Sequence, residues 1–425
     1  MADHKQARRG REALTHPDFL LYTVARFFIV ACVEMQSVAV GWQVYEITRR
    51  PLDLGYVGLA QFLPGFFLFL ISGHIADRFD RKRLLGICYA GFAVCSGLLL
   101  LLALRHVRNV LPIYAVLLLL GAVRSLNGPV SRALLPQLVP MEHFPNAVAW
   151  NSTVFQGATI LGPSIGGLVY AAFHGPVVVY ASACLVAVGS MIATQRISSR
   201  STRLDTDPIS VRTIFAGFHY VWRQRLILAL ISLDMFAVLL GGAVALLPVY
   251  ASEILKTGPW GLGLLRSAPG VGAAAMALYL AHRPLQSRAG IAMLWAVGGF
   301  GVCTIAFGVS RVLWWSLLLL VLLGASDMIS VIIRGTLIQL ATPDAMRGRV
   351  NAIDMLFIGV SNELGQFESG LTAHWFGTVP SVVLGGIGTL VVIGLWAWIF
   401  PELRHADRMH AIAAESLEHS LDGTA

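Results

Sequence analysis

Long apolar runs alternate with short polar connections along most of this chain. A membrane-spanning helix needs about 20 consecutive, mostly apolar residues. The sequence predicts such spans near residues 19–42, 55–76, 84–104, 111–132, 145–172, 176–195, 226–250, 260–281, 289–309, 313–338, 350–375 and 379–400. We therefore expect an all-α integral membrane protein with twelve transmembrane helices, whose even number places both termini on one side.

Composition supports this class, because 56% of the residues are apolar and 13% are charged. No soluble globular domain has this balance. All five cysteines lie inside apolar runs and the twelve histidines show no metal-ligand spacing, so we expect no disulfide, metal or cofactor. The segment 1–18 is polar and basic without a short apolar core, so no cleavable signal peptide is expected.

The distribution of Lys and Arg predicts the orientation. With the N-terminus inside, 21 of the 31 Lys and Arg fall in cytoplasmic segments, six in outer loops and four within spans. Cytoplasmic loops of membrane proteins carry this excess of positive charge. This excess accounts for the net charge of +8, so the charge does not indicate a nucleic-acid partner. Both termini are predicted to be cytoplasmic.

A charged loop separates the second and third spans. Gly73–Arg83 reads Gly-His-Ile-Ala-Asp-Arg-Phe-Asp-Arg-Lys-Arg between two bilayer-length runs. This Gly-x-x-x-Asp-Arg-x-x-Arg-Lys pattern resembles the loop that major facilitator superfamily transporters carry at the same place. The resemblance implies the major facilitator fold and a gating role for the loop, assigned to Gly73, Asp77, Arg78, Arg81 and Lys82. It also implies that Asp77 latches the outward-open state, while the basic residues pair with carboxylates on the inner face.

The two halves of the chain repeat weakly. Leu120-Gly121-Ala122 returns as Leu323-Gly324-Ala325, and Leu161-Gly162 returns as Leu364-Gly365, each 203 residues later. Duplicated six-helix halves predict such a repeat, with a binding site near mid-membrane where the halves meet. We expect pseudo-symmetric halves at 1–195 and 226–400, a linker at 196–225, and a cytoplasmic tail at 401–425.

The linker contains one candidate helix. Ile209–Trp222 has apolar residues at helical spacing, which predicts an amphipathic helix on the inner leaflet. An extension of the seventh span is the alternative.

Four ionisable side chains lie near the middle of predicted spans, namely Glu34, Arg124, Asp234 and Asp327. Charges inside a bilayer are costly, so they commonly mark a substrate or ion pathway. The spans that carry them line the central cavity of the resembled superfamily. Arg124 and Asp327 are 203 residues apart, and we expect them to pair across the halves. A structural ion pair is the alternative for these two, and an idle carboxylate in water is the alternative for the others.

Glu34 is the predicted proton site. Its nearest cation in the same span is Arg26, two helical turns away. Among the candidate carboxylates, Glu34 is therefore the one whose cost of desolvation is least offset by a nearby positive charge. Arg26 either modulates Glu34 or extends to the inner headgroups. Asp234, by contrast, is expected to meet water from the cytoplasmic side in the inward-open state.

The fifth span carries a glycine-rich run. Gly162 and Gly166 permit close helix contact, and Pro163 removes a backbone donor and bends the helix. With Gly167, this Gly-Pro-x-x-Gly-Gly run resembles the antiporter motif of superfamily exporters, although Ala158 replaces its usual leading glycine. The eleventh span has Gln366 in place of the proline, so only one half has the kink.

Further motifs narrow the resemblance. Leu135–Pro140, Asn146–Asn151 and Arg347–Asn351 resemble a bacterial branch of proton antiporters that includes siderophore exporters of the enterobactin type. The resemblance implies a monomeric secondary transporter of the bacterial inner membrane that exports a siderophore or drug-like molecule against protons. Uptake or facilitated diffusion by the same fold, or a receptor or scaffold role, is the alternative.

Other classes find little support in the sequence. A membrane-embedded enzyme would need a motif such as His-Glu-x-x-His or a Ser-His pair at mid-depth, and neither is present. A primary pump would need a Gly-x-x-x-x-Gly-Lys phosphate loop, which is also absent. The sequence does not identify the substrate, the transport direction or the coupling ion.

Overall fold

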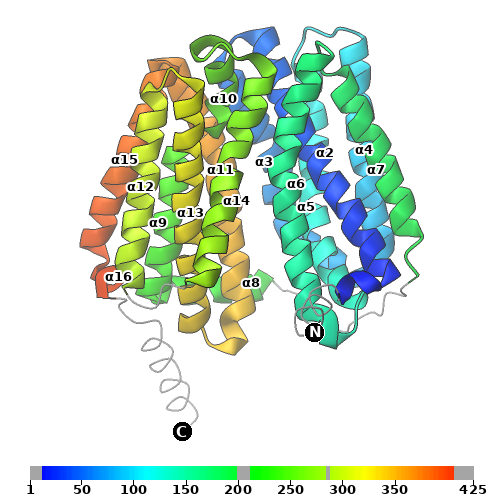
Figure 1. Cartoon of the computed structure of the whole chain (residues 1–425). Coiled ribbons are helices and arrows are strands. Elements are labelled where there is room, and N and C mark those ends of the chain that lie inside the picture. The colour runs from blue at the N-terminus through cyan, green and yellow to red at the C-terminus, as the bar shows by residue number, and fades with distance from the viewer. Residues whose placement is uncertain (1–11, 199–210, 284–287, 406–425) are drawn as a thin grey trace, which may run out of the picture. The chain divides into compact units, whose positions relative to one another are not determined.

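A computed structural model describes residues 12–198, 211–283 and 288–405 of the chain. Within these ranges the regular structure is helical, with no strand. Figure 1 shows the long helices of each half running along a common direction. The all-α prediction is confirmed.

Eleven of the predicted spans each correspond to one long helix, and the seventh begins with α9 (Arg225–Gly241). These helices are α2 (Pro17–Thr48), α3 (Pro51–Arg78), α4 (Arg81–Leu104), α5 (Leu111–Leu134), α6 (Phe144–Ala172), α7 (Val177–Gln195), α9 (Arg225–Gly241), α11 (Gly258–His282), α12 (Ala289–Val309), α13 (Leu313–Ala341), α14 (Asp344–Phe376) and α15 (Thr378–Ile399). Among the described residues, ten segments are long and apolar enough to cross a membrane. The two remaining helices, α3 with 28 residues and α14 with 33, also have the length of a span.

Short helices complete the described chain. They are η1 (Ala13–Thr15), η2 (Leu135–Gln137), η3 (Met141–His143), η4 (Ala243–Leu246), α10 (Leu247–Val249), η5 (Tyr250–Ile254), α8 (Val211–Arg223) and α16 (Pro401–His405).

The seventh span is broken rather than continuous. Helix α9 ends at Gly241, and the chain continues through the 3₁₀ turn η4, the short α10 and the π-helical turn η5. Pro248 explains the break, because it lacks a backbone donor and its ring clashes with the carbonyl four residues earlier. Gly241 and Gly242 add conformational freedom at the break.

The helices group into two compact units. Unit 1 comprises residues 1–49, 60–209 and 257–267, and unit 2 comprises residues 50–59, 210–256 and 268–425. Two short segments, 50–59 and 257–267, therefore group with the unit built mainly from the other half of the sequence.

The same packing scheme occurs in both units. In unit 1, α2 packs against α6 and α7, while α4 packs against α5 and α7. In unit 2, α9 packs against α14 and α15, while α12 packs against α13 and α15. These five helices of unit 1 thus have counterparts in unit 2, as duplicated halves predict.

Helix α8 is separate from the seventh span. Gln224 has an extended conformation between α8 and α9 and interrupts the helix. Helix α8 packs against α14, where the Phe218 and Phe357 ring centroids are 6.1 Å apart. The described part of the linker is therefore a helix separate from the seventh span, and its amphipathic placement on the inner leaflet stays a prediction. Ile209 lies outside the described residues.

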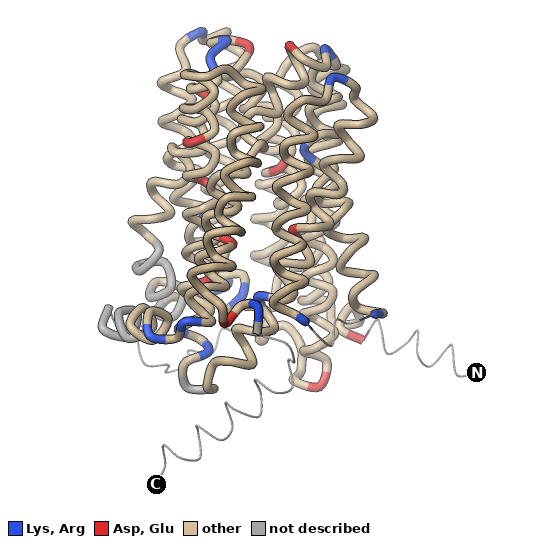
Figure 2. The backbone as a smooth tube through the Cα atoms, turned by 90° about the vertical axis from the view of Figure 1, so that its left-hand side faces the viewer, with Lys and Arg blue, Asp and Glu red and all other residues tan. Residues whose placement is uncertain are grey.

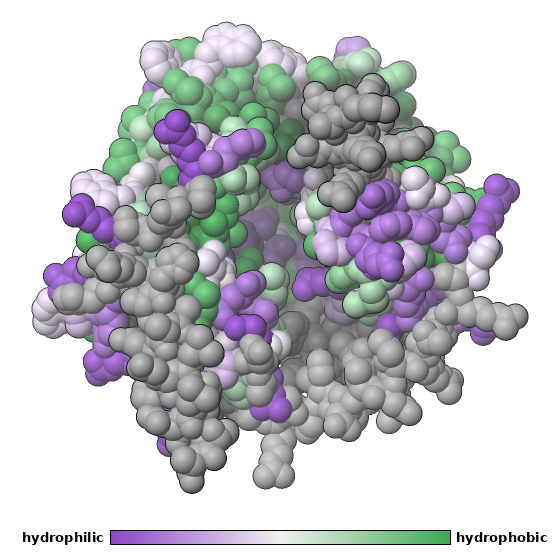
Figure 3. Space-filling view, turned by 60° about the horizontal axis from the view of Figure 1, so that its bottom comes forward, coloured by the Kyte–Doolittle hydropathy of each residue, from purple (hydrophilic) through white to green (hydrophobic). Residues whose placement is uncertain are grey.

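Charged residues are concentrated at the ends of the helices. Figure 2 shows few Lys, Arg, Asp or Glu along their middle parts. Figure 3 views the predicted cytoplasmic end, where hydrophilic side chains gather while hydrophobic ones lie along the flanks. Large apolar side chains such as Phe67, Leu185 and Trp398 are 69, 74 and 78% exposed. A lipid environment accounts for this exposure.

Candidate functional site

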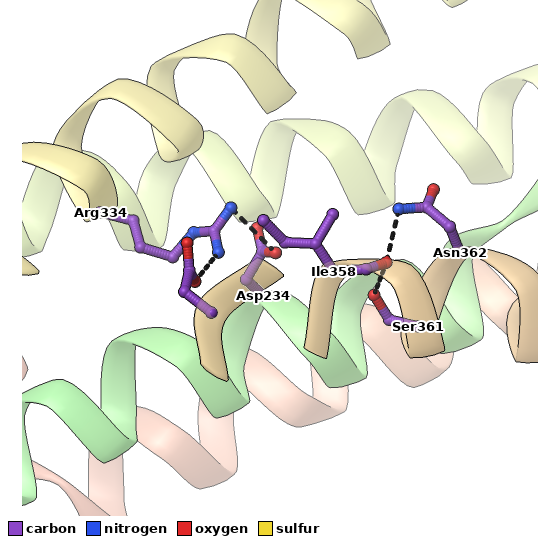
Figure 4. Close-up of polar contacts among 6 residues, drawn as sticks. Asp234, Arg334, Ile358, Ser361 and Asn362 are labelled. Atoms are coloured by element: carbon purple, nitrogen blue, oxygen red, sulfur yellow. Dashed lines mark hydrogen bonds and ion pairs between the residues drawn. The ribbon is translucent and has the colours of Figure 1, made fainter. Parts of the chain in front are cut away.

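A buried ion cluster joins three helices of unit 2. Arg334 of α13 donates to Asp354 of α14, and its Nη2 lies 3.3 Å from Oδ2 of Asp234 of α9. Figure 4 shows the Arg334 guanidinium beside the Asp234 carboxylate. The side chains of Arg334, Asp234 and Asp354 are 4, 8 and 13% exposed. We call these three residues the ion cluster.

Helix geometry places a third carboxylate near the ion cluster. Asp327 precedes Arg334 by seven residues, which puts both on the same face of α13 and about 10 Å apart along its axis. Asp327 interacts electrostatically with Asp234 and Arg334. It makes no direct hydrogen bond or ion pair with a described side chain of unit 2.

Two polar groups of α13 are buried without partners. They are the hydroxyl of Ser330, a residue that is 2% exposed, and Nε of Arg334. Ser330 lies between Asp327 and Arg334 in the sequence and on neighbouring faces of the helix. A polar line therefore follows α13 from Asp327 through Ser330 to the ion cluster.

The neighbouring turn of α14 is also polar. The carbonyl of Ile358 accepts hydrogen bonds from Ser361 Oγ at 3.1 Å and Asn362 Nδ2 at 2.8 Å, as Figure 4 shows. Bonds from side chains to backbone carbonyls let a spanning helix carry polar residues without leaving donors unpaired.

The ion cluster was incompletely predicted from the sequence. Asp234 is one of its members, and here it is buried and paired with Arg334. The expectation that it meets cytoplasmic water in the inward-open state stays a prediction. Arg334 is one of the four basic residues inside spans, yet no role was predicted for it. The available signal was the seven-residue spacing from Asp327, which places an acid and a base on one helix face.

The corresponding region of unit 1 contains a chain of hydrogen bonds. Arg26 Nη1 donates to Tyr22 Oη at 3.3 Å, and Tyr22 Oη donates to the carbonyl of Ser131 at 3.2 Å. The Arg26 guanidinium also lies 5.7 Å from the centroid of the Phe155 ring, a cation–π distance. Arg26 is therefore held by Tyr22 and Phe155, so these contacts do not support its direct action on Glu34.

Glu34 and Arg124 lie in different surroundings of unit 1. Glu34 is half-buried, its Cβ faces Gly162 of α6, and its carboxylate has no hydrogen bond or ion pair to a described side chain. Arg124 is exposed and its Nη1 donates to Gln61 Oε1 at 2.9 Å. Arg124 and Asp327 belong to different units, and their pairing stays a prediction.

The charged loop between α3 and α4 anchors helix ends. Arg81 Nη1 donates to the carbonyl of Ala133 at 3.1 Å, and Lys82 Nζ donates to the carbonyl of Ile197. Ala133 is in the last turn of α5, and Ile197 follows the end of α7. Helix C-termini have unpaired carbonyls and a partial negative charge, so they attract cations.

The predicted carboxylate partners of these basic residues are not among their described contacts, and the pairing stays a prediction. Arg81 and Lys82 bind backbone carbonyls, not carboxylates, in the part of the chain that the structure describes. The side chains of Gly73, Asp77 and Arg78 lie outside the described residues. Their gating role stays a prediction.

The glycine-rich run of α6 permits close contacts inside unit 1. A Cβ on Gly162 would lie 2.7 Å from Glu34 Cβ, and one on Gly166 would lie 2.7 Å from Met35 Cα, both in α2. A Cβ on Gly167 would lie 2.9 Å from Gly263 Cα at the start of α11. These spacings leave no room for side chains, so the glycines allow α2 and α11 to approach α6.

Hydrogen bonds reinforce the contact between α6 and the start of α11. Ser164 Oγ donates to Ser267 Oγ at 2.8 Å, and Ser267 Oγ donates to the Ile160 carbonyl at 2.6 Å. Arg266 Nη2 donates to Ser37 Oγ of α2 at 2.8 Å. Helix α6 remains continuous through Pro163, whose carbonyl lies beside Gly263. The predicted bend itself stays a prediction.

No group of three or more His, Cys, Asp or Glu able to hold a metal occurs in the described residues. The polar groups described above are carboxylates, guanidinium groups and hydroxyls. Such groups can bind and release protons and can bind polar parts of a substrate.

The chain is similar to proteins of known function along nearly its whole length. Enterobactin exporters of Escherichia coli strain K12 and Shigella boydii serotype 18 are each 27% identical to the chain. The alignments cover 92% of this chain and 94% and 93% of those exporters.

Solved transporters share the fold. The crystal structure of a D-xylose–proton symporter superposes with a TM-score of 0.68 at 16% identity, covering 90% of this chain and 97% of that one. A nucleoside transporter superposes with a TM-score of 0.70 at 12% identity, covering 90% of this chain and all of the other.

A family model described as a transmembrane secretion effector of the major facilitator superfamily matches residues 14–422. This match covers nearly the whole chain, and with it the prediction of a transporter that is not an enzyme is confirmed. The chain belongs to the transmembrane secretion effector family of the major facilitator superfamily, and it is an integral membrane secondary transporter.

Proposed function

We propose that this protein exports a small molecule from the cytoplasm across the bacterial inner membrane, driven by proton entry. The observation that carries the proposal is the set of carboxylates inside the spans, at Glu34, Asp234 and Asp327. A carboxylate held away from bulk water can bind a proton on one side of the membrane and release it on the other. The full-length similarity to enterobactin exporters supports export as the direction.

Alternating access would couple the export of the substrate to the entry of protons. Each unit has its own helix packing and its own polar cluster, so each can move as a body while the contacts within it persist. We place both termini in the cytoplasm, because 21 Lys and Arg fall in the segments on that side and six fall in the outer loops.

The substrate class follows from the relatives. We propose a siderophore or a drug-like molecule of comparable polarity, with Arg124 and Glu34 of unit 1 exposed to it. Arg124 is exposed, and the Glu34 carboxylate has no partner among the described side chains. A monomer is sufficient for this scheme, because one chain contains both units.

The charged loop between α3 and α4 would set the equilibrium between the inward-open and outward-open states. We propose that Asp77 stabilises the outward-open state by binding the N-terminal end of α14, where the helix dipole favours a negative charge. Asp77→Asn should then abolish transport while leaving expression and membrane insertion unchanged. Transport at the wild-type rate by this variant would refute the latch.

Efflux measured in inverted membrane vesicles tests the function. Vesicles with the full chain should accumulate enterobactin or another member of a panel of siderophores and lipophilic drugs when a pH gradient is applied, and a protonophore should abolish this. Vesicles without the chain are the control. Accumulation that persists after the gradient is dissipated would overturn proton coupling, and accumulation only in the opposite orientation would overturn export.

A further inference from the structure

We infer that Asp327 is the residue that binds the coupling proton, and that Arg334 is a positioning residue that controls its release toward the cytoplasm. The inference rests on the proposed proton coupling and assigns that coupling to unit 2. It differs from the assignment to Glu34 made from the sequence.

Charge balance is the first argument. The ion cluster contains one guanidinium and two carboxylates, so it has a net charge of −1 when all three groups are ionised. An ionised Asp327 would add a second uncompensated negative charge within the same helix packing. Asp327 is half-buried, and charges held away from water without a partner are costly and are relieved by protonation. Asp327, which lacks a direct cation partner in unit 2, is the carboxylate on which a proton relieves this charge.

The surroundings of Asp327 contribute few other charges. Of the helices packed against α13, α9 has Asp234 near this level, and its Arg225 is at the far end, paired with Glu402. Helix α12 has no charged residue, and its only titratable group is the Cys303 thiol.

Two more helices bring titratable groups to the unit. Helix α11 meets α13 through Gly272, and its titratable residues in unit 2, Tyr279 and His282, follow near its end. Helix α14 contributes Asp354, with Arg347 and Arg349 nearer its start and Glu363 and Glu368 further along. Arg334 is therefore the cation that acts on Asp327 from within the helix packing.

The direction of the polar line is the second argument. In the predicted topology α13 runs from the outer side to the inner side, so Asp327 lies near mid-depth and Arg334 lies two turns nearer the cytoplasm. Ser330 lies between them with a buried hydroxyl that has no partner. The line therefore leads from the proton site to the predicted cytoplasmic end.

The sharing of Arg334 gives a mechanism for release. Arg334 pairs with one carboxylate on α9 and another on α14, so a shift of α14 against α13 would separate it from Asp354. The guanidinium would then be available to Asp327, and the ionised form of Asp327 would become favourable. The O–H bond of the Asp327 carboxyl breaks, and the proton passes to water on the cytoplasmic side.

Infrared difference spectroscopy tests the assignment without a transported substrate. The purified full chain in lipid vesicles is titrated with acid and base, and the carbonyl band of a protonated carboxyl group is followed. We expect a titrating band that is lost in Asp327→Asn and retained in Glu34→Gln. Asp80→Asn is the matched control, because Asp80 is exposed and an Asn can still accept the hydrogen bond from the Arg83 amide at the start of α4.

Variants of the ion cluster test the positioning role. In Asp354→Asn, the band should titrate on the order of one pH unit lower, because one nearby negative charge is lost. In Arg334→Lys, which keeps the charge but not the planar fork, the band should remain but its midpoint should shift. Because Arg334→Lys keeps a cation beside Asp234 and Asp354, it avoids leaving these two carboxylates without a partner.

The outcomes separate the assignment from the proposed function. A band that survives in Asp327→Asn and is lost in Glu34→Gln would overturn the assignment and move the proton site to unit 1. A wild-type protein without any titrating carboxyl band would overturn it too, as would an unchanged midpoint in both cluster variants. Efflux that needs no pH gradient would instead refute proton coupling itself, whatever the infrared result.

Discussion

Equivalent positions of the two units contain different chemistry. Ser131 of α5 and Arg334 of α13 are 203 residues apart, the spacing of the internal repeat. In unit 1 the Ser131 carbonyl accepts a hydrogen bond from Tyr22, which Arg26 supports from the same helix. In unit 2 Arg334 pairs with two carboxylates from two other helices.

The difference between the units concerns charge as well as contact. Arg124 of unit 1 is replaced by Asp327 at the equivalent position of unit 2. Unit 1 therefore presents cations in this region, whereas unit 2 gathers carboxylates around one cation. The helix packing is shared, but we propose that the charges that respond to protons are those of unit 2.

Loss of the central cation should have the largest effect. Arg334→Gln leaves two buried carboxylates without their partner, and breaking a buried ion pair in this way costs about 3–5 kcal/mol. We expect a clear fall in the thermal unfolding temperature of the detergent-solubilised protein. The double variant Arg334→Gln with Asp234→Asn should recover part of the loss, and no recovery would show that the two residues are not coupled.

Small residues at helix contacts should give the next largest effect, and here the two units should behave alike. Gly167 and Gly370 are also 203 residues apart, and a Cβ on Gly370 would lie 2.8 Å from Gly55 Cα in unit 2. Gly167→Val and Gly370→Val should each destabilise their unit and reduce export. Gly394→Val is the control, since no atom lies within 4 Å of a Cβ there. Equal stability of all three variants would contradict the inference that helices are in close contact at Gly167 and Gly370.

Removal of the loop cations should have a moderate effect. Arg81→Gln takes a charged donor from the last turn of α5, and a hydrogen bond made by a charged group contributes about 1.5–3 kcal/mol. We expect lower thermal stability with the pH dependence of export unchanged. Arg83→Gln is a suitable comparison, because Arg83 is exposed. A pH profile that moves in Arg81→Gln would show that the loop takes part in proton coupling.

The smallest effect is expected for the neutral hydrogen bond of unit 1. Tyr22→Phe removes the bond to the Ser131 carbonyl and the contact with Arg26, a net loss of about 1 kcal/mol. Export should keep its pH dependence, because no carboxylate takes part in this chain of contacts. If Tyr22→Phe alters the pH profile as strongly as Asp354→Asn does, the contrast between the units does not hold.

The sequence predicted the helices well and the side-chain partners poorly. Hydrophobic length located all twelve long helices, because a spanning segment must satisfy its backbone internally and stay apolar. The break after Gly241 was missed, although Pro248 marks it. Side-chain partners were harder to predict, because they depend on which helices lie next to one another. Asp354 contacts Arg334 from another helix. Arg81 contacts the C-terminal end of α5, and the composition of the chain does not show that these two segments are neighbours.

Proton-driven efflux by three matched proteins tests the central claim most directly. Wild type, Asp327→Asn and Glu34→Gln are reconstituted into liposomes at equal amounts, and efflux of one transported siderophore is measured with and without a pH gradient. We predict that Asp327→Asn loses the stimulation by the gradient but keeps substrate exchange, while efflux by Glu34→Gln, at whatever basal rate, is still stimulated by the gradient. Stimulation that is retained in Asp327→Asn and lost in Glu34→Gln would contradict the account.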